Sequence, residues 1–69
     1  MKAFITLTYS VDNSPLKLNP LAIESFYKEI SGNNTIIVCT RDPYYVKETV
    51  EEVEAIIEEW MKHQVGTLT

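Results

Sequence analysis

The fold of this chain is decided by residues 44–61, which read YYVKETVEEVEAIIEEWM, a short strand that runs directly into an amphipathic helix. Thr49 predicts the helix start, because its hydroxyl and the carboxylate of Glu52, three residues later, can form a reciprocal capping box. Apolar side chains then recur at helical spacing and fall on one face. They are Val50, Val53, Ile56, Ile57, Trp60 and Met61. We expect this face to cover a sheet formed by the preceding residues.

The residues before this segment alternate between apolar and polar side chains, as strands do. Residues 3–11 follow this period of two, with Phe4 as the exception. Turn formers at residues 12–15 lead to a second alternating run at residues 16–18. Residues 35–40 are rich in β-branched side chains and apolar on both faces, which is typical of a central strand.

Two further turns are predicted on either side of this central strand. Residues 31–34 read SGNN, and both Gly and Asn tolerate the positive φ angles of tight hairpins. Residues 41–43 read RDP, in which Pro43 fixes φ at the first corner position of a turn. A last strand at residues 44–47 then leads into the helix.

The segment after Asn19 and Pro20 has two interpretations, because Asn as a cap followed by Pro is a good helix start. It can continue as a helix of about three turns, or a single turn at residues 20–22 can precede a strand over residues 23–30. The neighbouring hairpin partner, and the resemblance described below, favour the strand. The predicted fold is therefore α+β, an antiparallel meander of about four strands with one C-terminal amphipathic helix packed on it.

The chain has 69 residues and forms one domain. We place this domain at residues 1–66, with Gly66 as the helix stop and residues 67–69 as a frayed tail. A chain this short buries only roughly 60% of its unfolded surface, and its single cysteine, Cys39, cannot form an internal disulfide. One Trp, four Tyr and two Phe residues supply a large packing area. We therefore expect a homo-oligomer.

The charge and composition exclude several classes of protein. The net charge is −4, and most of the acids lie on or beside the helix, which disfavours binding to nucleic acid. No apolar run approaches the ~20 residues of a membrane span, and the N-terminus lacks the apolar core of a signal peptide. One Cys and one His are too few for a zinc site. These features predict a cytoplasmic protein without a metal or cofactor.

Three segments, in the same order along the chain, carry a family resemblance. They are Leu18-Asn19-Pro20 followed by Ile23-Glu24, then residues 35–38, and then residues 45–53, the most specific of the three. Together they resemble the small flagellar FlbD/SwrD-type proteins and their short bacterial and phage relatives. The resemblance implies short strands followed by a helix. It also implies an accessory, non-enzymatic protein that acts by contact and has no catalytic residues.

Four residues form the candidate binding or interface cluster, namely Arg41, Tyr44, Tyr45 and Trp60. Arg, Tyr and Trp are the residue types that most often anchor interfaces. Tyr44 and Tyr45 are neighbours in a strand and point to opposite faces, so one of them lies outside the main core. The simpler alternative is that both tyrosines pack where sheet and helix meet, with their hydroxyls in water.

The other chemically active side chains have structural explanations. Acids at the helix start, such as Glu48 and Glu52, stabilise it through the helix dipole by ~0.3–1 kcal/mol each, and they do not indicate a metal or acid–base site. His63 is expected to interact with Glu59, one helical turn earlier. Because no nucleophile motif accompanies His63, the sequence predicts no catalytic residue and no enzyme.

The predicted function is a small interaction or regulatory module that acts as a homo-oligomer through an exposed sheet face or edge. An alternative is a small-ligand binding protein of phage or bacterial origin. In that alternative, a pocket between subunits uses Arg41 and a tyrosine to hold a nucleotide-like anion.

Overall fold

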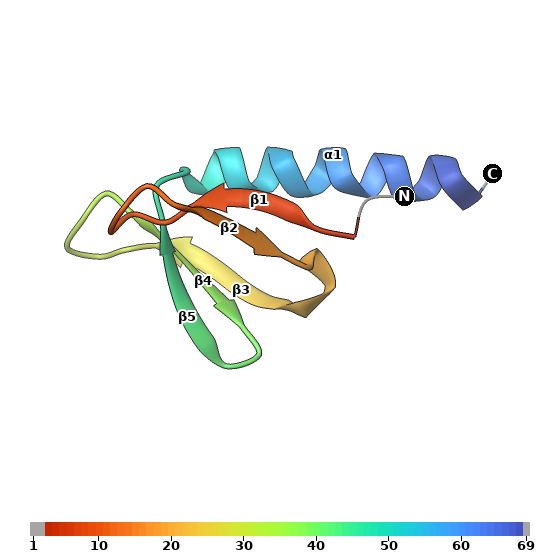
Figure 1. The fold of residues 1–69 in the computed structure, drawn as a ribbon. Coiled ribbons are helices and arrows are strands. Elements are labelled where there is room, and N and C mark those ends of the chain that lie inside the picture. The colour runs from red at the N-terminus through yellow and green to blue at the C-terminus, as the bar shows by residue number, and fades with distance from the viewer. Residues whose placement is uncertain (1–2, 69) are drawn as a thin grey trace.

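The computed structural model describes the backbone of residues 3–68 and the side chains of residues 3–63. The elements in chain order are β1 (Ile5–Thr8), β2 (Pro15–Leu18), η1 (Pro20–Ala22), β3 (Ile23–Lys28), β4 (Thr35–Cys39), β5 (Asp42–Val46) and α1 (Val50–Leu68). The fold is an α+β domain in which antiparallel strands are followed by one helix (Figure 1), as predicted. The described residues contain five strands rather than about four.

The strands form two antiparallel sheets that are joined at one corner. β1 pairs with β2, and β3, β4 and β5 form a three-stranded sheet in that order. The end of β1 reaches β5 through a bridge between Tyr9 and Val46. Backbone hydrogen bonds from Lys47 N–H to the Thr8 carbonyl (2.9 Å) and from Ser10 N–H to the Tyr45 carbonyl (3.0 Å) flank this bridge. The N-terminal hairpin is thereby fixed to the last strand.

The ambiguous segment after Asn19 is a single helical turn followed by a strand. The Asn19 side chain caps η1 by accepting a hydrogen bond from the Leu21 N–H (3.0 Å), and Pro20 occupies the first helical position. Ile23 already has extended backbone angles, with φ −76° and ψ 122°. Pairing of β3 with β4 therefore outweighs the slight local preference for a longer helix.

The turn between β4 and β5 lies one residue earlier than predicted. Its central residues are Thr40 and Arg41, which both have positive φ angles, 51° and 72°. Cys39 and Asp42 form the pair that closes this two-residue turn, and Pro43 lies inside β5 opposite Val38. The position of Pro43 turns its nitrogen away from β4, so the proline costs no hydrogen bond of the ladder. The predicted turn with Pro43 at its corner was wrong, because this position in β5 accepts a proline and the turn forms before it.

Helix α1 begins with the predicted capping box. The Thr49 N–H donates to Glu52 Oε1 (2.8 Å), and the Glu52 N–H donates to Thr49 Oγ1 (3.1 Å). The helix continues past Gly66, the predicted stop, to Leu68. A glycine inside a helix costs only about 1 kcal/mol, so it does not oblige the helix to end. Of the predicted tail, Thr69 lies outside the described residues.

The core lies between the two sheets and α1, which contacts β1 and β3. Its buried members are Ile5, Leu7, Leu16, Leu18, Ile37, Cys39, Val46 and Val53. From the apolar face of α1, Val53 is fully buried, and Ile56, Ile57 and Trp60 are partly buried against this core. Met61, predicted to belong to the same face, is 52% exposed. Only part of the predicted apolar face of α1 therefore belongs to the core.

Candidate functional site

The four residues of the predicted cluster lie on different parts of the molecule. Arg41 is exposed at the tip of the β4–β5 hairpin, and this tip points away from α1, which carries Trp60 (Figure 1). Tyr44 is half-buried against the core, and its ring lies 6.4 Å from that of Tyr9 at an angle of 56°. Tyr45 is on the opposite face of β5 and is 42% exposed. The arrangement does not bring the four together within the chain, and nothing in it favours an anion pocket over a protein contact.

Tyr45 belongs instead to an apolar surface on the side of the three-stranded sheet that faces away from the core. Ile37 at the centre of β4 is fully buried, so Ile36 and Val38 on either side of it point the other way. The strand register places further residues beside them in two rows across the sheet. These rows are Tyr27–Ile36–Tyr45 and Ser25–Val38–Pro43. We call these six residues the outer face.

Ile36 shows why the outer face differs from an ordinary solvated surface. It is only 9% exposed, yet it lies outside the core cluster. Its direct cross-strand neighbours are Tyr27 and Tyr45, which are 48% and 42% exposed. Opposite residues in antiparallel strands have Cβ atoms only about 5 Å apart, so the two rings flank the isoleucine. None of the six outer-face residues carries a charge, which is typical of the central part of a contact surface.

The sequence interpretation found Tyr45 but missed its neighbours. The signal was present in residues 35–40, which are apolar on both faces and therefore need a cover on each side. The favoured strand over residues 23–30 puts Ser25 and Tyr27 on one face but does not say which residues of another strand lie beside them. The register with β4, which places Tyr27 beside Ile36, becomes visible only in the structure.

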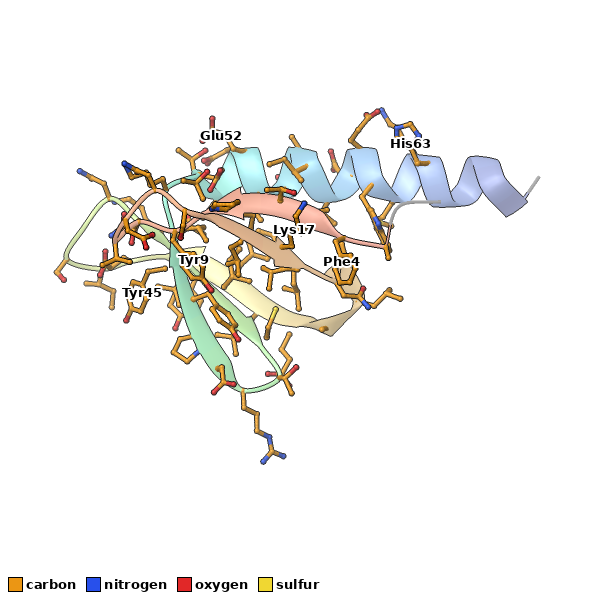
Figure 2. All side chains as sticks on the ribbon, in the orientation of Figure 1. Phe4, Tyr9, Lys17, Tyr45, Glu52 and His63 are labelled. Carbon is orange, nitrogen blue, oxygen red and sulfur yellow. The ribbon has the colours of Figure 1, made fainter. Side chains whose placement is uncertain are left out.

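Trp60 lies in a groove between the β1–β2 hairpin and α1, with a volume of about 580 Å³. The groove is lined by Ala3, Phe4, Ile5, Thr6, Lys17, Ile56, Glu59, Trp60 and His63. Phe4 is 56% exposed in it, and Figure 2 shows Phe4 and Lys17 beside α1. The His63 Nε2 lies 3.3 Å from Glu59 Oε1, the interaction expected from their spacing. Because the groove carries both an ammonium and a carboxylate, its charge does not select one class of ligand.

Glu48 forms a long-range contact with Thr8 that the sequence did not indicate. Its Oε1 accepts a hydrogen bond from the Thr8 N–H and its Oε2 accepts one from the Thr8 hydroxyl, both at 2.9 Å. The carboxylate therefore ties the end of β1 to the connection between β5 and α1. Both of its oxygens have protein partners. Across the described residues, no group of three or more His, Cys, Asp and Glu side chains is placed to hold a metal ion.

Cys39 is buried on β4 and is a free thiol. Burial raises the pKa of the Cys39 thiol, and the nearby charge of Glu24 raises it further. A thiol with a raised pKa is mostly protonated near neutral pH and is therefore a poor nucleophile. This environment is that of a small core side chain.

No helix in the described part of the chain is long and apolar enough to cross a membrane. Comparison of the chain with protein-family models, with curated proteins and with solved structures finds no match. The resemblance to the FlbD/SwrD-type proteins therefore stays a prediction that rests on the three sequence segments.

Proposed function

We propose that this protein is a small, non-enzymatic interaction module that works as a homo-oligomer and makes its contacts through the β3–β4–β5 sheet. The observation that supports the proposal is the outer face, an uncharged surface of two apolar rows on a domain of 69 residues. Tyrosines such as Tyr27 and Tyr45 are well suited to contacts, since their rings are apolar and their hydroxyls remain hydrated. The accessory role implied by the FlbD/SwrD resemblance agrees with this proposal.

Size adds to the argument. A domain this small has little core with which to offset the entropy of folding, and association of a folded form stabilises that form by mass action. Several large apolar side chains are exposed across the described residues, including Tyr27, Tyr45, Phe4 and Met61. Burial of roughly 100 Å² of apolar surface contributes about 2.5 kcal/mol. The proposed site of action is the cytoplasm, where a reducing environment suits the free thiol of Cys39.

Light scattering during size-exclusion chromatography, over a range of micromolar concentrations, tests this function. We expect a mass at least twice the 7.9 kDa of one chain, and a melting temperature that rises with protein concentration. A mass of one chain throughout, with a melting temperature independent of concentration, would contradict the proposal.

A dilution series followed by backbone amide NMR then locates the contact. The amides of β3, β4 and β5 are expected to shift as the oligomer dissociates. The amides around Val11, an 87% exposed apolar residue in the β1–β2 turn, serve as the internal control and should not shift. Shifts confined to β1 and α1 would place the contact at the groove beside Trp60, and the role proposed for the outer face would be lost.

A further inference from the structure

The edges of the two sheets are unequally protected. β2 is an edge strand of four residues that begins with Pro15 and carries Lys17, and both residue types discourage pairing with another strand. β5 contains Pro43 and is bonded at its far end by the β1 extension. Among the described strands, β3 pairs with β4 alone. Its six residues, IESFYK, form the longest described strand and contain no proline, although β3 also carries one lysine, Lys28, and a register shift between Ile23 and Ser25.

The hydrogen-bond pattern shows which backbone groups of β3 are available. Glu29 N–H donates to the Asn34 carbonyl (2.9 Å), just beyond the last β3–β4 pair, Lys28 with Thr35. In an antiparallel pair, alternate residues direct their N–H and C=O groups to the partner. Tyr27 therefore bonds β4, and the N–H and C=O groups of Phe26 and Lys28 point to the open edge. A cavity of about 310 Å³ at this end of β3 is lined by Lys28 and by Val50 and Glu51 of α1.

We propose that two copies of the chain pair antiparallel through β3, with Phe26 of each copy opposite Phe26 of the other on a two-fold axis. This proposal rests on the proposed function and specifies its interface. Counting outward from Phe26 then places Glu24, which lies at the register shift between Ile23 and Ser25, opposite Lys28 of the second copy, twice in the dimer. Both side chains are exposed in the single chain, and opposite charges in facing positions stabilise a pair of strands.

Charge selects this register over the neighbouring ones. A shift by one residue would require the N–H and C=O groups of residues such as Tyr27 to bond the second copy. Those groups already bond β4, so they are not available. A shift by two residues places either Glu24 or Lys28 opposite Phe26, and both charge pairs are lost. The register centred on Phe26 is thus the one in which strand geometry and side-chain charge agree.

The pairing also extends the outer face. With Phe26 on the axis, Tyr27 of one copy lies opposite Ser25 of the second copy. The row Tyr45–Ile36–Tyr27 therefore continues into the row Ser25–Val38–Pro43 of the second copy. By the two-fold symmetry, the Ser25 row of the first copy likewise continues into the Tyr27 row of the second. The two outer faces become one continuous uncharged surface across a six-stranded sheet, which provides the larger contact area that binding another protein requires.

Complementary charge reversal tests the register. Lys28→Glu creates two like-charge pairs with Glu24, and Glu24→Lys creates two with Lys28, so each variant alone should dissociate at least about tenfold more readily than the wild type. An equimolar mixture of the two restores both opposite-charge pairs, and we expect dimers to return. Lys17→Glu, which makes the same charge change on β2, is the matched control and should assemble like the wild type.

Glu24 also accepts a hydrogen bond from the Arg41 N–H (3.0 Å), so Glu24→Lys carries a risk of local misfolding. Amide hydrogen exchange on the wild-type protein tests the same interface without relying on a variant. The Phe26 and Lys28 amides have no β4 partner, so they should exchange fast in dilute protein and become protected as concentration rises. The Tyr27 amide, bonded to β4, should be protected at both concentrations.

The outcomes separate the two proposals. A wild-type protein that is monomeric at every concentration overturns both the function and the interface. A wild-type oligomer whose Lys28→Glu variant behaves like Lys17→Glu, and whose Phe26 amide stays unprotected, overturns the β3 pairing and leaves the proposed function standing. A Lys28→Glu variant that dissociates and is restored only by the Glu24→Lys partner establishes the register.

Discussion

The Glu48 carboxylate holds Thr8 through two hydrogen bonds, one to its backbone N–H and one to its hydroxyl, across forty residues of chain. Thr8 ends β1 at the corner where the N-terminal hairpin meets β5. Hydrogen bonds to a charged acceptor are stronger than those between neutral groups. This contact, together with the adjoining backbone bonds, therefore holds the two sheets in one domain.

Glu48→Ala should lower the free energy of unfolding by about 2–3 kcal/mol, because it removes a charged acceptor and leaves the Thr8 N–H without its protein partner. Urea denaturation monitored by circular dichroism measures the change. Glu51→Ala, an exposed acid in the first turn of α1, is the matched control and should cost less than about 1 kcal/mol. Equal losses for the two variants would mean that the Thr8 contact adds nothing.

The β4–β5 turn should be improvable by substitution. Thr40 and Arg41 occupy the left-handed region, which costs residues other than Gly and Asn roughly 1–2 kcal/mol each. The double substitution Thr40→Asn/Arg41→Gly supplies the residues that a two-residue hairpin turn prefers. It keeps the backbone N–H that Glu24 accepts from, so we expect a stabilisation of about 1 kcal/mol or more in thermal unfolding. Arg41→Lys leaves the backbone strain in place and should change little.

The apolar face of α1 should divide into a part that stabilises the fold and a part that does not. Val53 is fully buried, so Val53→Ala should destabilise by about 2 kcal/mol through lost burial and an unfilled cavity. Met61 is 52% exposed, and Met61→Ala should cost less than about 1 kcal/mol in dilute protein. A large loss from Met61→Ala that appears only at high protein concentration would show that Met61 is buried by association.

The β1–β2 turn offers a test by pH. The Ser14 hydroxyl (2.6 Å) and the Ser14 N–H (3.0 Å) both donate to Asp12 Oδ1, and these bonds lower the pKa of the Asp12 carboxyl below its ordinary 3.8. A lowered folded pKa means that the turn gains stability above the unfolded pKa and loses it as pH falls through the folded one. Ser14→Ala removes the hydroxyl bond, the larger cause, so NMR titration should show the pKa of Asp12 moving upward. An unchanged titration would contradict the assignment.

The sequence predicted the elements whose signals are local. The capping box of Thr49 and Glu52, the helical start at Asn19 and Pro20 and the order of strands followed by a helix are each found in the structure. The prediction failed where the backbone depends on pairing. The turn at Thr40 and Arg41 has no Gly or Asn to mark it. It is supported instead by the hydrogen bond that the Arg41 N–H donates to Glu24 on β3.

The candidate site was predicted less well for a related reason. Arg41, Tyr44, Tyr45 and Trp60 were grouped by residue type, but the β4–β5 hairpin carries Arg41 away from α1 (Figure 1). The outer face depends on which residues lie opposite one another in three strands. Such a register follows from the whole sheet and cannot be obtained from the period of a single strand.

The corner formed by Tyr9, Val46 and Glu48 sets the order in which a nascent chain can finish folding. The β3–β4–β5 meander contains neighbours in sequence, so it can form while α1 is still inside the ribosome. The N-terminal hairpin, although synthesised first, must wait for residues 46–48 before it gains its permanent place. A nascent chain whose Lys47 and Glu48 are still inside the ribosome would hold a hairpin and a meander without the bonds that these two residues make to Thr8.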